Sequence, residues 1–308
     1  MRAVDEMLGD PGLWGGLHRP GITRQEADIL LWGIPFDGAA SFRKGAAEAP
    51  RAIRNITFSI CPTTEDFEVM GIKLLDCGDL FGADQETLFA AVESEAEALV
   101  RSGKFFTFIG GDHSVTIPIL RGMDRALSGE LGIVHIDAHF DLCDELGGNR
   151  LSHGCTQRRA LELQHVSGLE NLFFVGIRSA ETCEADFLRE RDANVIGAGE
   201  YRRIGTEEVL KRIEEKMRFY GSVYVTIDID ALDPAFAPGT GTPQFGGLDS
   251  RELLDLLRGL FKRLPVVGFD LVEVAPPLDA GEITLFAARK ILTECWGHYE
   301  RKMRGKRS

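Results

Sequence analysis

The chain has 308 residues, of which 44% are hydrophobic and 27% charged, so it is long enough to bury a wide sheet inside an ordinary globular fold. Its net charge of −13 argues against non-specific binding to nucleic acid. No apolar run reaches the ~20 residues of a membrane-spanning helix, and the acidic N-terminus does not resemble a secretory signal. We therefore expect a cytoplasmic protein that binds neither nucleic acid nor membrane.

Short apolar runs alternate with amphipathic stretches along the chain. The runs predict strands at Ile29–Ile34, Ile72–Asp76, Phe105–Ile109, Ile133–Asp137, Leu172–Gly176, Asn194–Ile196, Val223–Ile229 and Val266–Val272. The amphipathic stretches predict helices at Gln85–Ser102, Val115–Leu127, Cys183–Glu190, Thr206–Tyr220, Ser250–Leu264 and Ile283–His298. This alternation predicts a parallel sheet with helices on both faces.

No linker or internal repeat divides the chain, so residues 1–308 are expected to form a single domain. Residues 1–27 precede the first strand as an N-terminal extension, and the basic residues 299–308 are expected to form a solvated, frayed tail. No CxxC pair occurs, so the sequence suggests neither a cysteine zinc site nor a disulfide framework. The six cysteines are Cys61, Cys77, Cys143, Cys155, Cys183 and Cys295.

Three predicted strands end in side chains that could bind metal ions. These are His113 after two glycines, then Asp137, His139 and Asp141, and finally Asp228 and Asp230. Alternate residues of an extended chain point to one side, and ligands of parallel sheets bind beyond the carboxyl ends of the strands. Four aspartates balance two divalent cations, and this oxygen-rich set favours Mn²⁺, although Ni²⁺, Co²⁺ or Zn²⁺ could also bind.

Neighbouring polar residues are open to other interpretations. A single aspartate after a strand is commonly a turn or helix-cap residue, so Asp112 and Asp233 are expected to be turn residues or partners of the ligands. His135 shares the parity of Asp137 but is expected to be a packed histidine or to position a ligand.

At these residues the chain resembles the arginase/agmatinase/formiminoglutamase (ureohydrolase) family, and its agmatinase-like members most closely. The resemblance rests on an ordered set of motifs that covers nearly the whole chain. They are GIPFDGAASFRKGAAEAPRAIR (33–54), GGDHS (110–114), DAHFD (137–141), SHG (152–154), RRA (158–160), DIDALDPAFAPGTGTP (228–243) and GFDLVEVAPPLD (268–279).

The resemblance implies a three-layer α/β/α fold with a mostly parallel sheet of about eight strands. It also implies a homotrimer or homohexamer with two Mn²⁺ ions per subunit. By family analogy, one ion takes His113, Asp137, Asp141 and Asp228, and the other takes Asp137, His139, Asp228 and Asp230.

Two further residues match catalytic positions of the family. His153 would relay a proton to the leaving amine, a role that suits an imidazole. Glu273 would grip the guanidinium, since a carboxylate fits that planar cation, whereas Asp270 is expected to be structural. The resemblance thus implies that a metal-bridging hydroxide attacks a small cationic guanidino compound to release urea and an amine.

The loop 142–151 is expected to select the far end of the substrate. Cys143 stands where arginases have an asparagine, and Asp144 and Glu145 would repel a carboxylate but could pair with an ammonium, as in agmatine. Alternatively, both acids simply face solvent. Other residues, such as Gln244, depart from the agmatinase pattern. The substrate could therefore be agmatine, guanidinobutyrate, guanidinopropionate or another guanidine; arginine and formiminoglutamate fit the loop less well.

Other functions remain open at this point. A deacetylase would have this architecture but uses one zinc and lacks the full aspartate set. A non-catalytic partner subunit should have lost a ligand, His153 or Glu273, yet all are present. A metal-responsive binding protein would bind metal without turning over any guanidine.

Overall fold

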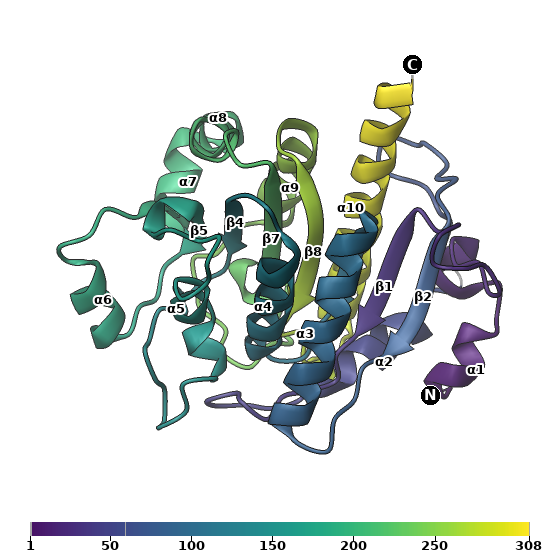
Figure 1. Cartoon of the computed structure of the whole chain (residues 1–308), viewed down its shortest axis with the longest axis horizontal. Coiled ribbons are helices and arrows are strands. Elements are labelled where there is room, and N and C mark those ends of the chain that lie inside the picture. The colour runs from purple at the N-terminus through teal and green to yellow at the C-terminus, as the bar shows by residue number, and fades with distance from the viewer. Residues whose placement is uncertain (1, 59, 308) are drawn as a thin grey trace.

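A computed structural model of the chain describes residues 2–58 and 60–307 (Figure 1). Eight strands form one sheet in the order β2-β1-β3-β8-β7-β4-β5-β6, and every described pair of strands is parallel. This finding confirms the predicted α/β class. The strands are β1 (Ile29–Gly33), β2 (Leu74–Asp79), β3 (Phe105–Ile109), β4 (Leu131–Ile136), β5 (Leu172–Ile177), β6 (Asn194–Gly197), β7 (Ser222–Asp228) and β8 (Val266–Val272).

Helices cover both faces of the sheet and complete three layers. One hydrophobic core joins the sheet to α3 and α4, and the other joins it to α2, α8, α9 and α10. In Figure 1, α3 and α4 lie side by side in front of the strands. The helices are α1 (Val4–Leu8), α2 (Ala49–Asn55), α3 (Gln85–Ser102), α4 (Thr116–Ala126), α5 (Thr156–Ala160), α6 (Thr182–Leu188), α7 (Ala198–Ile204), α8 (Thr206–Met217), α9 (Ser250–Arg263) and α10 (Ile283–Arg307).

Four helices, α1, α2, α5 and α7, were not expected from the sequence. Each has five to seven residues, which is too short for an apolar stripe of helical period to stand out. Strand β2 also lies later in the chain than the predicted run Ile72–Asp76, because the polar residues Asp76 and Asp79 belong to it. Neither difference changes the order of the layers.

The N-terminal segment packs into the main core. Trp14 is fully buried and meets the ring of Trp296 edge-on at a centroid distance of 5.0 Å. Its indole nitrogen donates to Asp76 Oδ2 at 2.8 Å. The same carboxylate accepts two hydrogen bonds from the buried guanidinium of Arg54, at 2.7 and 2.8 Å. Trp14 thus anchors the N-terminal segment in the main core and in contact with its buried ion pair.

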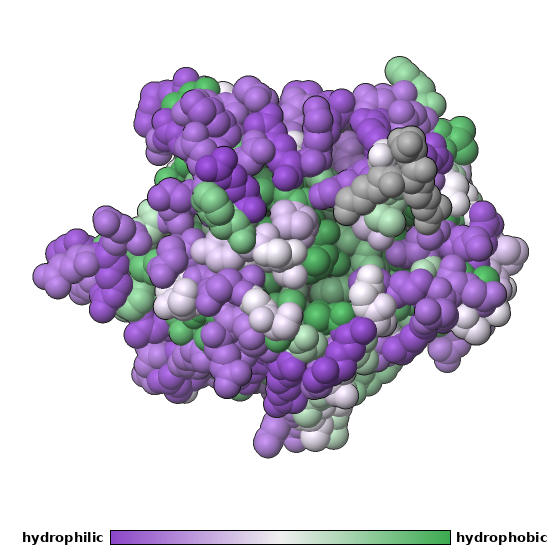
Figure 2. All heavy atoms as spheres, turned by 45° about the horizontal axis from the view of Figure 1, so that its top comes forward, coloured by the Kyte–Doolittle hydropathy of each residue, from purple (hydrophilic) through white to green (hydrophobic). Residues whose placement is uncertain are grey.

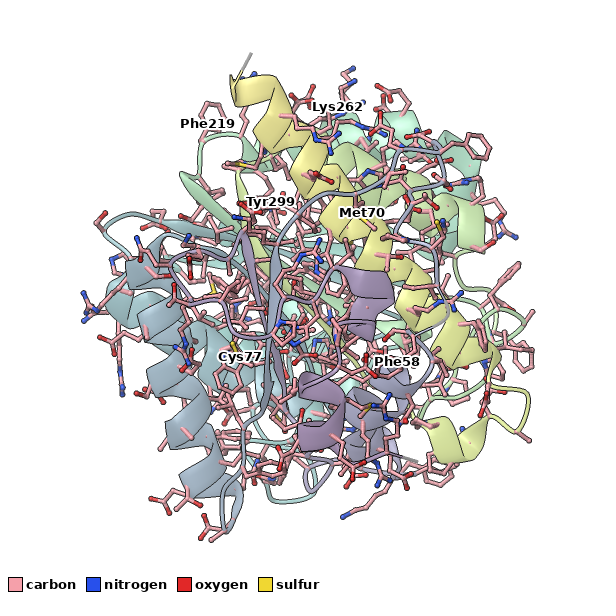
Figure 3. All side chains as sticks on the ribbon, turned by 90° about the vertical axis from the view of Figure 1, so that its right-hand side faces the viewer. Phe58, Met70, Cys77, Phe219, Lys262 and Tyr299 are labelled. Carbon is pink, nitrogen blue, oxygen red and sulfur yellow. The ribbon has the colours of Figure 1, made fainter. Side chains whose placement is uncertain are left out.

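The basic C-terminal residues continue α10 as far as Arg307 instead of fraying after His298. Arg304 pairs with Glu300 one turn earlier, and Arg301 pairs with Asp66 at 2.6 Å. Figure 3 shows this end of α10 with Tyr299 and Lys262 labelled, and Tyr299 stacks on Phe105 at a centroid distance of 4.0 Å. These ion pairs and the ring contact explain why the helix extends.

The face of the molecule drawn in Figure 2 is largely hydrophilic. Figure 2 shows polar residues over most of one face, with hydrophobic residues gathered in a hollow near its centre. Among the described helices, none is both long enough and apolar enough to cross a membrane.

Candidate metal centre

Four adjacent central strands, in the order β3-β8-β7-β4, end at one edge of the sheet, the lower edge in Figure 1. His113 follows β3, Glu273 follows β8, Asp228 ends β7 and Asp137 follows β4. Parallel strands bring their carboxyl ends together, so residues up to 160 positions apart in the chain meet there. The arrangement of strands thus gathers the predicted side chains at one place.

The segment after β4 brings its side chains together by a bend, which corrects the expected extended alternation. β4 ends at Ile136, and the N–H of His139 donates to Asp137 Oδ1 at 2.7 Å in a tight turn. Asp141 has a φ of 55°, in the left-handed region that side chains other than glycine rarely adopt. The convergence of Asp137, His139 and Asp141 therefore comes from the turn and from this unusual backbone.

The same kind of turn recurs after β7 and β3. The N–H of Asp230 donates to Asp228 Oδ1 at 2.8 Å, and the N–H of Ser114 donates to Asp112 Oδ1 at 3.0 Å. In both places an aspartate fixes the backbone two residues later. Asp112 thus caps the short helix that begins at His113, in agreement with the expected turn role. Asp228 stabilises its own turn by accepting a hydrogen bond through Oδ1.

The predicted ligand atoms lie within a few ångströms of one another. Nδ1 of His113 is 3.1 Å from Asp137 Oδ2, 3.0 Å from Asp141 Oδ2 and 3.3 Å from Asp228 Oδ2. Nδ1 of His139 is 3.4 Å from Asp137 Oδ1 and 3.3 Å from Asp230 Oδ2. Asp137 therefore belongs to both groups, with one oxygen toward each histidine.

The atoms at the centre of this cluster that could bind a metal ion have no hydrogen-bond partner in the described part of the chain. Nδ1 of His113, Oδ2 of Asp137 and Oδ2 of Asp141 are buried but unpaired among the described residues. Buried polar groups of this kind are rare, since each one is costly without a partner. Oxygen and imidazole donors that point into a common space fit hard or borderline divalent cations well.

The electrostatics of the cluster also favour cations. Burial and the neighbouring charges of Asp230 and Asp137 raise the pKa of Asp228 well above its ordinary value. Burial lowers the pKa of His139, but its hydrogen bonds to Asp137 and Asp230 outweigh that effect and raise the pKa to about 12. The ionised carboxylates of the cluster therefore repel one another in a buried place, and bound divalent ions could neutralise their charge.

His135 lies close to the cluster, but both of its ring nitrogens already have partners within the protein. Its Nε2 is 3.1 Å from Asp137 Oδ2 and 2.9 Å from the carbonyl oxygen of His139, while its Nδ1 lies 3.0 Å from the Gln157 amide. Because both ring nitrogens have partners, His135 fits a positioning role, as the sequence suggested. It can nevertheless be grouped with His113 and Asp137 as a possible ligand set.

Asp270 lies beneath the cluster. Its Oδ2 accepts hydrogen bonds from Thr116 at 2.7 Å and from Tyr224 at 3.1 Å, and its side chain is buried. Thr226 in turn lies 2.8 Å from Nε2 of His113. These buried contacts agree with a structural role. Asp233 is a turn residue that accepts from the N–H groups of Ala235, Gly246 and Gly247.

His153 and Glu273 form a pair beside the cluster. Nδ1 of His153 lies 2.9 Å from Glu273 Oε1, which also accepts from the N–H of His113 at 2.8 Å. Nε2 of His153 is 2.8 Å from the hydroxyl of Ser41. Burial lowers the pKa of His153, but the bond to Glu273 and its charge outweigh burial and raise the pKa to about 9. Glu273 has a φ of 61°, so its backbone is strained like that of Asp141.

A pocket of about 150 Å³ opens onto His153 and part of the cluster, whereas the buried Glu273 is not among its lining residues. His139, Asp141 and His153 line this pocket, and so do Glu181 and Glu184. The sequence interpretation missed these two glutamates, although acids just after the carboxyl end of β5 were a usable signal. No lysine or arginine of the described chain lines the pocket.

Two of the three residues expected to select the substrate lie elsewhere. Asp144 pairs with Arg150 at 2.6 Å and with Arg159 at 2.5 Å, and Glu145 is exposed; neither lines the pocket. Both acids are exposed, in agreement with the alternative that they face solvent, and arginines of the same region take up the Asp144 carboxylate. Cys143 does line the pocket.

The chain is similar in sequence and in structure to proteins of one known family. Residues 27–297 match the Arginase family. An agmatinase of Bacillus anthracis is 37% identical over 88% of this chain and 91% of its own length. Among solved structures, proclavaminate amidino hydrolase of Streptomyces clavuligerus (36% identity, 92% and 94% coverage) superposes with a TM-score of 0.80. Agmatine ureohydrolase of Thermoplasma volcanium (30% identity, 92% and 94% coverage) gives 0.82. The chain therefore belongs to the arginase family.

Proposed function

We propose that the protein is a metal-dependent amidinohydrolase that cleaves agmatine to urea and putrescine. The observation that carries this proposal is the charge of the pocket. A guanidino end would reach the carboxylate and imidazole cluster, and the far end would meet Glu181 and Glu184, with no lysine or arginine among the described residues that line the pocket. Such a wall favours an ammonium group over the carboxylate of a guanidino acid.

Six residues would hold two divalent ions, for which we propose Mn²⁺. One ion would use His113, Asp137, Asp141 and Asp228, and the other Asp137, His139, Asp228 and Asp230. The unpaired donor atoms of His113, Asp137 and Asp141 support this assignment. When bound, such a pair of ions supplies hydroxide at neutral pH by lowering the pKa of water to about 7.

The remaining steps fall to residues of the chain. Oε1 of Glu273 is occupied by His153 and by the N–H of His113, so Oε2 would accept from the guanidinium. His153 lines the pocket and can give a proton to the departing amine. In the net reaction, one C–N bond of the guanidinium breaks, oxygen from water joins the carbon, and the released nitrogen gains a proton.

Glu181 is the better candidate for contact with the ammonium end. Glu184 uses both of its oxygens within the protein, accepting from the N–H of Leu142 and from the N–H of Glu181, each at 2.8 Å. Burial raises the pKa of the Glu184 carboxyl to about 7. Through its two hydrogen bonds, this carboxyl stabilises the backbone of the pocket wall. Glu181 is exposed at the pocket and could face a cation.

The test is urea release by the Mn²⁺- or Ni²⁺-loaded protein with agmatine, guanidinobutyrate, guanidinopropionate, arginine and formiminoglutamate. We expect the highest kcat/KM with agmatine. Preference for a guanidino acid would replace this proposal by its nearest alternative. No urea from any substrate, with two ions bound, would favour a non-catalytic subunit or a metal-binding protein.

Two matched variants test whether Glu181 determines the preference for agmatine. Glu181→Gln should raise the KM for agmatine about tenfold while leaving that for guanidinobutyrate unchanged or lower, since only agmatine carries the ammonium. Asp144→Asn removes a carboxylate that is already paired with arginines, so the agmatine preference should survive. Equal effects of the two substitutions would refute the role of Glu181.

The family resemblance also supports a cytoplasmic homotrimer or homohexamer as a further part of the proposal. Light scattering of the purified protein would distinguish these assemblies from a monomer.

A further inference from the structure

Two cysteine side chains meet beside the pocket, one of which lines it. Cys143 lines the pocket two residues after Asp141, and Cys183 lies in the first turn of α6, two residues after Glu181. Their sulfur atoms are 2.7 Å apart. Figure 1 shows α6 standing off the body of the protein, near the loop that leads from β4 to α5. The contact therefore joins two segments that are 40 residues apart in the chain.

The two cysteines differ in access to solvent. Cys143 is buried, with 1% of its surface exposed, whereas Cys183 is exposed. Reagents in solution can therefore reach Cys183 first, and Cys143 is in place to react with whatever forms there. An exposed thiol next to a second, resolving thiol is typical of cysteines that undergo reversible oxidation.

The backbone around the pair is already held in position. The N–H of Leu142 donates to Glu184 Oε1 at 2.8 Å, and the N–H of Cys143 donates to the carbonyl of Gly154 at 3.1 Å. A disulfide has its sulfurs about 2.05 Å apart, so the two side chains need to approach by less than 1 Å. The two segments can be linked without rebuilding either one.

We propose that Cys143 and Cys183 form a reversible disulfide that fastens the loop carrying Asp141 to α6. A small disulfide such as oxidised glutathione is the oxidant. The sulfur of Cys183 attacks one of its sulfurs, and one small thiol leaves with a proton. Cys143 then attacks Cys183 Sγ and releases the second small thiol, so one dithiol is oxidised and one small disulfide is reduced.

Two other cysteines provide contrasts within the same chain. Cys155 is buried, and its sulfur faces the carbonyl of Asn149 at 3.6 Å. Cys77 is on β2, and its sulfur faces the carbonyl of Leu75 at 3.7 Å; Figure 3 labels it beside α3. A general oxidation of the protein would not single out Cys143 and Cys183, so the identity of the linked peptides decides the matter.

The experiment treats the full-length, Mn²⁺-loaded protein with oxidised glutathione or with dithiothreitol, then counts free thiols and maps peptides by mass spectrometry. We expect the thiol count to fall from six to four, with one linked peptide that joins Cys143 to Cys183. Because the bond restricts the unfolded chain, the melting temperature should rise by about 4 °C. Dithiothreitol should reverse both changes.

Single substitutions test which thiols take part. Cys183→Ser changes an exposed residue and should abolish both the linked peptide and the melting shift. Cys155→Ser should leave both in place. Six free thiols after oxidation, a glutathione adduct that persists on Cys183, a linked peptide containing another cysteine, or an unchanged melting temperature would each overturn the proposal. None of these readouts depends on the substrate proposed above.

Discussion

Oε1 of Glu273 lies 2.9 Å from Nδ1 of His153 and also accepts the backbone N–H of His113. One carboxylate oxygen thus links the proposed proton donor to a proposed metal ligand. At the other ring nitrogen, the hydroxyl of Ser41 can accept a hydrogen bond from protonated Nε2, and the N–H of Ser41 can donate one to unprotonated Nε2. Both charge states of His153 therefore have a partner at Nε2, as a residue that exchanges protons requires.

Glu273→Gln tests the effect of the negative charge, because the variant keeps the size and shape of the side chain. The amide oxygen of the variant could still accept from His153, but the loss of charge should lower the pKa of His153 from about 9 towards the ordinary value of ~6.5. We expect kcat to fall at least 100-fold while metal binding persists, on the order of the loss of an acid–base group. Two-dimensional NMR of the histidine rings and metal analysis would check both results. An unchanged titration of His153 would contradict the proposed link.

Asp228→Asn should disrupt both proposed metal positions, because Asp228 is assigned to each of them. We expect metal content to fall below two ions per subunit and urea release to fall by roughly 1,000-fold or more. Metal analysis after gel filtration measures the first effect. Asp233→Asn is the matched control, since the Asp233 carboxylate accepts from the backbone N–H groups of Ala235, Gly246 and Gly247 and is not a proposed ligand. Two tightly held ions in Asp228→Asn would disprove the shared role.

The buried pair of Arg54 and Asp76 should matter greatly for stability. Both side chains are fully buried, so removal of the cation by Arg54→Leu leaves a charge without its partner. We expect the free energy of unfolding to fall by about 3–5 kcal/mol, as measured by denaturant unfolding. Arg263→Leu removes the cation that pairs with the largely exposed Glu207 and should cost no more than ~1 kcal/mol. Similar losses in the two variants would refute the distinction.

Acid should destabilise the protein through His298. Burial lowers its pKa to about 4; Arg258 and Arg301 add to the effect, while Glu65 and Asp66 oppose it. Between pH 6.5 and 4, the unfolded chain therefore binds a proton that the folded protein does not. The free energy of unfolding should fall by up to ~1.4 kcal/mol per pH unit over this range from His298 alone. Denaturant titrations at about pH 7 and 5 should show a smaller loss for His298→Gln than for the unsubstituted protein; equal losses would refute this account.

The sequence predicted the fold and the proposed ligands better than it predicted the geometry that joins them. Apolar strands followed by Asp137, His139 and Asp141 are a local pattern, and the structure brings these side chains together. The left-handed backbone of Asp141 depends on tertiary contacts, however, so an extended chain was expected in place of a bend. A short sequence window cannot reveal such a conformation in a residue other than glycine.

The pocket wall was harder to predict, because a loop sequence does not say which way its side chains point. From the sequence, Asp144 could face either the substrate or solvent; in the structure it pairs with Arg159, which lies 15 residues later in the chain. Glu181 was overlooked because it follows a different strand, β5. Only the order of strands, with β5 next to β4, brings it beside the cluster.

The strand order also bears on how the protein could change its chemistry over time. The proposed ion-binding side chains follow β3, β4 and β7, whereas Glu181 and Glu184 lie on a separate crossover between β5 and β6. A graft or a few substitutions in that one crossover could retune which guanidine is accepted and leave the catalytic machinery intact. Laboratory selection for new substrates should therefore begin with this short stretch.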